Sequence, residues 1–439
     1  MLVYVLTKQG KPVMPCSPVI ARLLLKHGKA KVKRRTPFTI KLNYDLLKEH
    51  TQELDTGLDT GSGTFGAAVT NDKQEILYLS QVEVRNDIRK KMTRRRQYRR
   101  TRRHRKCRYR PKRFDNRRTS RRKGRLPPTL TSKIEAHLRE LDFICKILPI
   151  SLDRLTIERA IFDNHAIKNS KVLTNNWLYQ KGELYGYENT KMYVRARDKH
   201  TCQLCKGKSE DQRLECHHIV SKKDGGTDIP ANLIILCKTC HEQVHKGIKK
   251  LSNRTIKASI TRNVHITQMN IIRSQILRLL PQAQTTLGCV TKIDREALGL
   301  PKTHYFDAAV IAGQGKALTF KHPYVLVKKC VAAGDYQQRK GKRSEQPVTR
   351  SKIQGFMTYD KVRYYGQEYF IKGRMSTGYA ILMDIYGSKQ HLGHTPKIAS
   401  MTRLSARKSC LVVSESIIKL NQDIQTGDLV VADITRGKY

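Results

Sequence analysis

Four cysteines between Cys202 and Cys240 limit what this chain can fold into more than any other feature. They form two Cys-x-x-Cys pairs, Cys202 with Cys205 and Cys237 with Cys240. Two such pairs can bring four thiolates to one point and so complete the tetrahedral coordination of a zinc ion. Cys216 fits neither pair, and we interpret it as a small buried apolar residue. We therefore expect a structural zinc site in this stretch.

Polar residues that suit catalysis lie between and after these cysteines: His217, His218, Asn232, His241 and His245. Neighbours on a strand point to opposite faces, so one of His217 and His218 can bind a metal while the other addresses a water molecule. His241 and His245, spaced i and i+4, fall on one helix face and can complete the metal site. Asn232 is placed to brace the loop that carries His218. These residues predict a ββα nuclease with one divalent cation; the alternative is a zinc ribbon with incidental polar residues.

The charge of the chain indicates a polyanionic partner. Its 439 residues carry a formal net charge of +49, with 86 Lys plus Arg against 37 Asp plus Glu. A charge of this size indicates DNA, RNA or both. An anionic membrane surface is the competing interpretation, but we find no long apolar segment and no amphipathic anchor. The remaining cysteines are scattered, and the N-terminus does not read as a secretory signal, so we expect a reducing, cytoplasmic location.

An arginine-rich tract occupies residues 85–125 and cannot pack a core by itself. Its first part lacks proline and glycine, and arginine favours helices, so we predict a long helix over about 86–109 that becomes ordered against phosphates. A solvated face or a localisation signal is the alternative. The expected nucleic-acid-binding residues are Arg94, Arg95, Arg96, Tyr98, Arg99, Arg100, Arg102, Arg103, Arg105, Arg108 and Arg110.

Four dispersed residues form a second candidate site: Asp59, Glu158, His304 and Asp307. Asp59 ends the first of three strand-like runs, at 54–58, 64–70 and 75–80, and Glu158 ends another strand. His304 and Asp307 are spaced i and i+3 at the start of an alanine-rich helix. Three converging carboxylates and a histidine would hold two Mg²⁺ ions for phosphodiester hydrolysis. Taken singly, Asp59 also fits a turn residue, and His304 with Asp307 fits a capped surface helix.

In the remaining segments, the pattern of apolar and turn residues predicts helices, strands and turns without candidate site residues. KPVMP at 11–15 is typical of a turn that follows a short strand and leads into an amphipathic helix closed by Gly28, within a small basic unit whose second strand is PFTIKL. Ser132 and Glu135 form a capping box for an amphipathic helix. LGCVTK at 287–292 is strand-like. From about residue 346, alternating apolar residues and glycine turns indicate a small all-β barrel or sandwich.

The order of these motifs resembles the IscB family, transposon-encoded RNA-guided nucleases related to the large CRISPR effector Cas nucleases. The matching stretches are KPVMP, where Val13 replaces the family's Leu, GLDTG at 57–61, the arginine tract with GRLPP, TIE at 156–158, WLYQKGELYG at 177–186, the His…Asn…His core and PKTHYFDA at 301–308. The middle stretch is itself similar to HNH endonucleases. Beyond about residue 390 the resemblance is loose.

The resemblance implies a multidomain α/β protein in which an RNase H-like (RuvC) core is split in three, with an inserted ββα HNH zinc module. The expected segments are an N-terminal PLMP-like unit at 1–50, RuvC-like segment I at 51–84, an arginine-rich bridge helix at 85–128, RuvC-like segment II at 129–188, the HNH domain at 189–250, RuvC-like segment III at 251–345 and a C-terminal β domain at 346–439.

The resemblance also implies roles. His218 would be the general base of the HNH site, with His217, His241 and His245 binding Mg²⁺ there, and Asp59, Glu158 and Asp307 binding two Mg²⁺ ions in the RuvC-like site. The HNH site would cut the guide-paired strand and the RuvC-like site the displaced strand. Guide RNA would be a further cofactor, the protein would act as a monomer in a ribonucleoprotein on double-stranded DNA, and the C-terminal domain would read a motif beside the target.

Two other functions remain open from the sequence. A protein-only HNH homing or restriction-type endonuclease explains the zinc module but leaves the arginine tract and the dispersed carboxylates without a use. A non-catalytic zinc protein that binds RNA explains the charge and the cysteines but leaves His217, His218 and Asn232 idle. Cutting of each DNA strand, measured separately, distinguishes the three.

Overall fold

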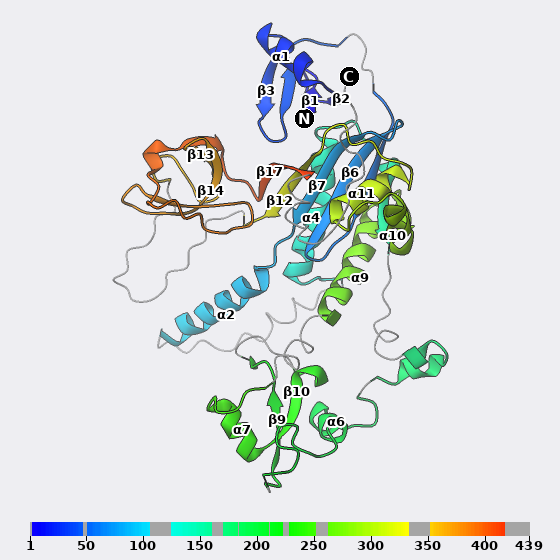
Figure 1. Ribbon diagram of the computed structural model, residues 1–439, viewed down its shortest axis with the longest axis vertical. Coiled ribbons are helices and arrows are strands. Elements are labelled where there is room, and N and C mark those ends of the chain that lie inside the picture. The colour runs from blue at the N-terminus through cyan, green and yellow to red at the C-terminus, as the bar shows by residue number, and fades with distance from the viewer. Residues whose placement is uncertain are drawn as a thin grey trace. The chain divides into compact units, whose positions relative to one another are not determined.

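The computed structural model describes residues 2–46, 51–105, 124–159, 170–182, 184–209, 211–222, 228–251, 262–332 and 352–417. The chain divides into two compact units. One consists of Met1–Ala160 with Ile271–Tyr439, and the other is Ile161–Asn270. Each unit is described below by itself, with the element labels of Figure 1.

The N-terminal part of the first unit is a four-stranded sheet with one helix. Its strands are β1 (Val3–Leu6), β2 (Pro12–Cys16), β3 (Ala30–Arg34) and β4 (Thr39–Leu42), in the order β2-β1-β4-β3, and α1 (Pro18–Lys26) follows β2. The expectation of a turn at KPVMP is wrong, because Pro12–Cys16 is strand β2. Both prolines are tolerated because β2 is an edge strand, where a missing N–H breaks no central ladder.

A seven-stranded sheet organises the rest of the first unit. The antiparallel strands β5 (Leu54–Asp59), β6 (Thr64–Asn71) and β7 (Ile76–Glu83) confirm the predicted meander. Strands β8 (Leu155–Arg159) and β11 (Gln284–Leu287) extend the sheet in parallel beside β5. On the other side, β12 (Tyr324–Cys330) runs parallel to β7, and β17 (Cys410–Ser416) pairs with β12. The resulting order is β11-β8-β5-β6-β7-β12-β17.

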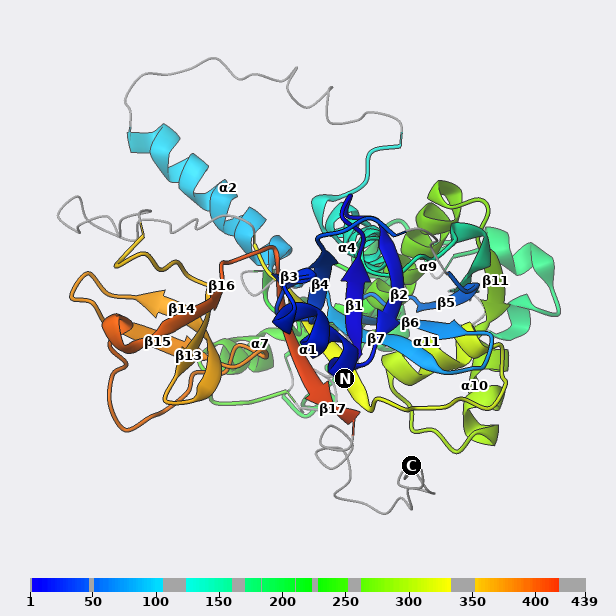
Figure 2. The same cartoon turned by 90° about the horizontal axis from the view of Figure 1, so that it is seen from above.

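Helices cover both faces of this sheet (Figure 2). On one face, α4 (Pro128–Cys145) and the end of α9 (Arg262–Leu279) pack through Ile134, Ile144 and Ile276 against the sheet. On the other face lie α11 (His304–Gly313) and α10 (Gly288–Ala297), and α11 packs through Phe306 and Ala309. The core therefore has three layers, and it fixes the positions of residues at the strand ends.

Two local predictions about these helices are wrong. Helix α4 begins at Pro128 with Pro127 as its N-cap, so Ser132 and Glu135 lie inside the helix and form no capping box. Proline suits the first helical position because its fixed φ matches the helix and its missing N–H would be unpaired there. Of the expected strand at 287–292, only Leu287 lies in a strand, at the end of β11, and the residues from Gly288 onward begin α10.

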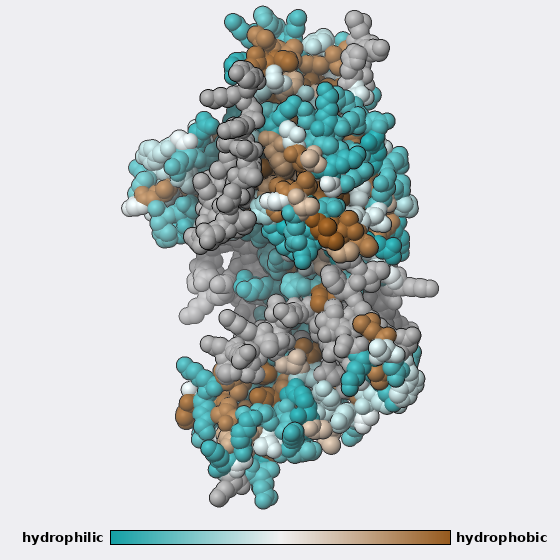
Figure 3. All heavy atoms as spheres, turned by 45° about the vertical axis from the view of Figure 1, so that its right-hand side comes forward, coloured by the Kyte–Doolittle hydropathy of each residue, from teal (hydrophilic) through white to brown (hydrophobic). Residues whose placement is uncertain are grey.

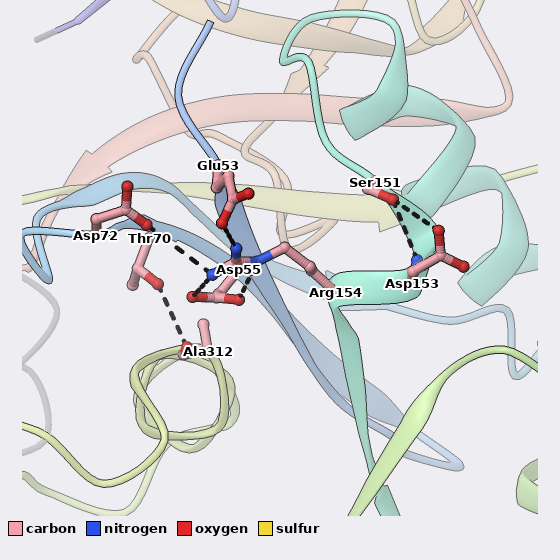
Figure 4. Close-up of polar contacts among 8 residues, drawn as sticks. All are labelled: Glu53, Asp55, Thr70, Asp72, Ser151, Asp153, Arg154 and Ala312. Carbon is pink, nitrogen blue, oxygen red and sulfur yellow. Dashed lines mark hydrogen bonds and ion pairs between the residues drawn. The ribbon is translucent and has the colours of Figure 1, made fainter.

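An arginine joins two neighbouring strands that are far apart in sequence (Figure 4). Arg154 belongs to the 3₁₀ turn η2 (Leu152–Arg154) that leads into β8. Its guanidinium donates to both carboxylate oxygens of Asp55 on β5, at 2.8 and 3.1 Å, and also pairs with Glu53. Such bidentate pairs fix orientation as well as distance. Asp55 therefore has a structural partner that holds β8 in register beside β5.

The second unit contains a β-hairpin followed by a helix. Strands β9 (Leu214–His218) and β10 (Leu233–Cys237) are antiparallel, and α7 (Lys238–His245) follows directly. Helix α6 (Thr190–Arg197) is held to the start of β10 and to the turn before it, because Arg197 donates to the carbonyl oxygens of Leu233 and Pro230. Short 3₁₀ turns complete the unit: η3 (Ser170–Val172), η4 (Asn176–Gln180) and η6 (Pro230–Asn232).

A separate small sheet lies in the C-terminal segment. It consists of β13 (Lys361–Tyr364), β14 (Gln367–Arg374), β15 (Ala380–Met383) and β16 (Thr402–Ser405), in the order β15-β14-β13-β16, with the 3₁₀ turn η7 (Ile398–Ser400). It has its own apolar core, which includes Val362, Ile371 and Leu382. The last described strand, β17, belongs instead to the seven-stranded sheet.

Hydrophilic side chains predominate over the described surface in Figure 3, and the apolar ones form separate groups. Among the helices that the structure describes, none is both long enough and apolar enough to span a membrane.

Candidate functional site

The structure brings Asp59, Glu158, His304 and Asp307 together; we call them the carboxylate site. Asp59 is the last residue of β5, and Glu158 lies near the end of the adjacent parallel strand β8. Because carboxyl ends of parallel strands meet at the same edge, both carboxylates reach one place. His304 and Asp307 lie on the first turn of α11, which packs against β5 and β6.

Each of the four residues of the carboxylate site forms a short hydrogen bond or ion pair. His304 Nδ1 lies 2.6 Å from Oδ2 of Asp59, whose side chain is 5% exposed. Arg273 from α9 donates through Nη2 to Glu158 at 3.0 Å and through Nε to the hydroxyl of Thr60 at 2.7 Å. Arg295 from α10 forms an ion pair with Asp307 at 2.9 Å. Two buried guanidinium groups thus balance part of the negative charge.

Burial and mutual repulsion change the acidity of these groups. Burial raises the pKa of Asp59 to about 6. Burial, together with the hydrogen bond and charge of Asp59, raises the pKa of Glu158 to about 8. Burial also raises the pKa of Asp307 and lowers that of His304. Crowded carboxylates with raised pKa values are typical of a site that a cation completes, because a cation removes the repulsion between them.

Glycines allow the helix to approach the sheet closely enough to form the carboxylate site. A Cβ atom on Gly66 of β6 would lie 1.9 Å from the carbonyl oxygen of His304. A Cβ atom on Gly57 of β5 would lie 2.2 Å from the carbonyl oxygen of Ala308. Side chains at either position would push α11, and His304 with it, away from Asp59.

Sequence reasoning missed Thr60, Arg273 and Arg295. Thr60 directly follows the predicted Asp59 and could have been found from its position. Arg273 and Arg295 lie within ordinary amphipathic helices and have no local motif. Only the packing of α9 and α10 beside the sheet reveals that their side chains, each 7% exposed, reach the carboxylates.

The four cysteines of the second unit lie together as predicted from their spacing. The Sγ atoms of Cys202, Cys205, Cys237 and Cys240 are all within 4.8 Å of one another. A hydrogen bond from Ser209 lowers the pKa of the Cys205 thiol to about 6, whereas burial raises that of Cys240 to about 12. Four converging thiols match the donor set of a structural zinc ion, which binds them as thiolates.

His217, His241 and His245 form a second group of possible metal ligands, the histidine cluster. One ring nitrogen of each lies within 4.8 Å of the others. The Nε2 atoms of His241 and His245 are 3.2 Å apart. Glu215, which sequence reasoning missed, lies 2.6 Å from Nδ1 of His241. A carboxylate bonded to one ring nitrogen of a histidine orients the other ring nitrogen toward a metal. The ECHH spacing could have revealed Glu215, because Glu215 and His217 lie on the same face of strand β9.

His218 points away from the histidine cluster, as strand alternation predicts. Its Nε2 lies 2.8 Å from the exposed carboxylate of Asp228. Asn232 is 2% exposed, and its side-chain amide accepts from the backbone N–H of Val220 at 2.9 Å and donates to the carbonyl of Val220 at 3.1 Å. Asn232 thus holds the chain two residues after His218.

Within the arginine-rich tract, residues Ile88–Arg105 form helix α2. Arg94, Arg95, Arg96, Arg99 and Arg100 are exposed, and Tyr98 is 36% exposed. Arg102, Arg103 and Arg105 continue the helix, while Arg108 and Arg110 lie outside the described residues. A helix with cations on all sides and no acidic residue among its 18 residues fits a polyanionic partner.

Comparison with known proteins gives two family matches. Residues 3–182 match the family described as RRXRR protein, and residues 202–247 match the HNH endonuclease family. The uncharacterized protein YisB of Bacillus subtilis (strain 168) is 46% identical over 44 residues, which are 10% of this chain and 40% of YisB. The chain thus covers less than half of the length of that relative.

Solved structures of Streptococcus thermophilus Cas9 are also similar. The complex with the GGAA PAM has 14% identity and a TM-score of 0.31, over 56% of this chain and 32% of the Cas9 chain. The complex with the AGGA PAM has 13% identity and a TM-score of 0.32, over the same shares. The chain spans about a third of those proteins. An RRXRR segment followed by an HNH endonuclease domain confirms the resemblance of this chain to the IscB family of nucleases.

Proposed function

We propose that this chain is an RNA-guided DNA endonuclease with two independent nuclease sites. The observation that carries the proposal is the carboxylate site, because residues 245 positions apart meet there in a chain that also holds an HNH domain. A protein-only HNH enzyme has no need for that second site. The two sites would cut the two strands of one DNA target.

The strand order supports an RNase H-like core of the RuvC type. In the sheet, β8 lies beside β5 on the side away from β6, and β11 lies beside β8, both running parallel to β5. In this arrangement the arginine-rich helix separates β7 from β8 in sequence, and the HNH domain separates β8 from β11. The core would therefore be assembled from three segments.

The donor sets fit the expected metals. Three carboxylates, Asp59, Glu158 and Asp307, would hold two Mg²⁺ ions, and the histidine cluster would hold one. The cysteine cluster would hold a structural Zn²⁺. Bound divalent cations would supply charge neutralisation of the scissile phosphate and of the oxygen that attacks it.

In the HNH site, His218 would accept the proton of the attacking water. Asp228, 2.8 Å from its Nε2, can orient the imidazole or share its charge. Asn232 keeps the backbone after His218 in place through its two bonds to Val220. In the carboxylate site, His304 would take the proton, because burial lowers its pKa and keeps the imidazole neutral.

The remaining roles follow the resemblance. The HNH site would cut the strand that pairs with the guide, and the carboxylate site would cut the displaced strand. Helix α2 would hold the phosphates of guide RNA and heteroduplex. The small C-terminal sheet would read a short DNA motif beside the target.

A strand-resolved cleavage assay tests the two-site proposal. With guide RNA and a target labelled on each strand, we expect His218→Ala to cut only the displaced strand. Asp59→Ala or Glu158→Ala should cut only the guide-paired strand. His27→Ala and Glu135→Ala, both exposed and remote from these residues in sequence, should cut both. If one active-site substitution abolished both cuts in a folded protein, two independent sites would be excluded.

Sequencing of RNA that co-purifies with the expressed protein tests the guide. A variable segment joined to a constant structured scaffold supports RNA guidance. Equal, sequence-specific cutting without RNA would favour the protein-only endonuclease, and RNA binding without any cleavage would favour the non-catalytic zinc protein.

A further inference from the structure

An aromatic pocket opens on the small C-terminal sheet, and the proposed nuclease sites make no use of it. It has a volume of about 660 Å³, within the range of small-molecule sites. Tyr364, Tyr365, Tyr379 and His394 supply its rings, and Lys397 and Ser400 supply polar groups. None of the described residues that line it is acidic.

The rings are arranged around a hairpin turn. The ring centroids of Tyr364 and Tyr365 are 4.5 Å apart, and that of His394 lies 6.0 Å from each. Tyr364 is 4% exposed, and its hydroxyl lies 2.9 Å from Nε2 of His394. Tyr364 and His394 therefore fix one another and form a rigid wall.

Tyr365 is unusual in both backbone and exposure. It occupies the two-residue turn between β13 and β14 with φ of 44°, followed by Gly366 with φ of 79°. Positive φ at both positions defines a type I′ turn, where asparagine or glycine is strongly preferred and a bulky residue is strained. The residue is nevertheless 79% exposed. Such strain, together with an exposed ring, suggests a use at this position other than stability.

We infer that this pocket binds an unstacked nucleobase of RNA, with Tyr365 as the stacking platform and Lys397 near the adjoining phosphate. Exposed rings beside a cation are the chemistry that captures unpaired bases. Loops of a structured RNA hold unpaired bases before any target is bound, whereas DNA has unpaired bases only in the displaced strand of a bound target. The inference rests on the proposed function, which supplies the RNA partner.

Photo-crosslinking of the full-length chain tests this. The probe is a hairpin RNA with 5-iodouridine in its loop, and the readout is the crosslinked residue, identified by mass spectrometry. We expect crosslinks at Tyr365, Tyr364 or His394. Tyr365→Asn should reduce the yield at this pocket by at least about fivefold, the lower limit for loss of one base stack. Tyr365→Phe should keep the crosslink yield of the parent chain.

The asparagine variant separates binding from folding. Asparagine suits the left-handed turn, so Tyr365→Asn should be at least as stable to heat as the parent chain. Tyr324→Asn, on an exposed tyrosine of β12, is the matched control and should leave the crosslinks at the pocket unchanged.

Three outcomes overturn the inference. The first is that the chain binds RNA but the crosslinks do not fall on residues of the pocket. The second is that Tyr365→Asn does not change the crosslink yield at the pocket. The third is an equal yield from a DNA hairpin with the same loop, which would contradict the choice of RNA. If the chain bound no RNA at all, the proposed function itself would fail, which is a distinguishable result.

Discussion

His304 and Asp59 lie 245 positions apart in sequence, yet Nδ1 of the histidine is 2.6 Å from Oδ2 of the aspartate. The contact exists because α11 lies against β5 and β6, where Gly57 and Gly66 leave room for its backbone. The geometry of the carboxylate site therefore depends on residues that have no functional groups of their own.

We predict that Gly66→Ala disrupts both stability and the carboxylate site. The new Cβ would lie 1.9 Å from the carbonyl oxygen of His304, so helix and strand must separate, at a cost of about 1–3 kcal/mol in the free energy of unfolding. Denaturant unfolding measures this cost, and displaced-strand cleavage should fall. Gly63→Ala is the control, because nothing lies within 4 Å of its Cβ position. An unchanged unfolding midpoint for Gly66→Ala would contradict the close approach.

Zinc removal should unfold the second unit. The cysteine cluster joins the turn at Cys202 to the start of α7, and the apolar cores formed by the described residues of this unit are small. We expect a chelator, or Cys237→Ser, to lower the bound zinc measured by mass spectrometry and to increase amide hydrogen exchange over β9, β10 and α7. Cys289→Ser, at an exposed cysteine outside the cluster, should change neither. Zinc content that survives Cys237→Ser would rule out this ligand set.

Acid should destabilise the first unit through His137. The ring is fully buried and stacks on Phe65. Its Nε2 accepts a hydrogen bond from the backbone N–H of Gly61, and its Nδ1 lies 2.8 Å from the carbonyl oxygen of Lys133. Burial lowers its pKa to about 4, against about 6.5 in the unfolded chain. The unfolded state therefore binds more protons between these values, so stability is complete above pH 6.5 and falls as the pH drops toward 4.

The loss of unfolding free energy attributable to His137 amounts to about 3 kcal/mol at most. His137→Gln should flatten the dependence of the unfolding free energy on pH in that window, whereas His27→Gln, at an exposed histidine, should not. A parent protein equally stable at pH 4.5 and pH 7 would disprove the prediction.

Lys328 and Glu140 form a buried ion pair between β12 and α4. Lys328 Nζ lies 2.8 Å from each oxygen of Glu140, which also accepts from the hydroxyls of Tyr78 and Ser80. Removing one partner leaves a buried charge alone, so Lys328→Met should cost about 3–5 kcal/mol of unfolding free energy.

A double-mutant cycle checks the ion pair. Lys328→Met with Glu140→Met should recover much of the loss, because no unpaired charge remains, although the hydroxyls of Tyr78 and Ser80 then lose their acceptor. If the double variant were as unstable as the sum of the single ones, the two residues would not be coupled.

The sequence by itself determined the parts whose geometry is local. The Cys-x-x-Cys pairs, the i, i+4 spacing of His241 and His245, and the opposite directions of His217 and His218 follow from backbone periodicity over a few residues. The meander at 54–80 was also predictable, because alternating apolar residues and turn residues mark each strand. The resemblance to a known family placed Asp59, Glu158, His304 and Asp307 as one candidate site.

Only the tertiary structure decided which distant residues meet. Arg273 and Arg295 look like ordinary helix residues until α9 and α10 pack beside the sheet. Strand β17 joins β12 although its sequence reads like the small β sheet that precedes it. Tyr365 became notable only when its positive φ and exposure were known. Spacing along a chain fixes neighbours on one helix or strand, whereas the order of strands and the packing of helices depend on the burial of all the segments together.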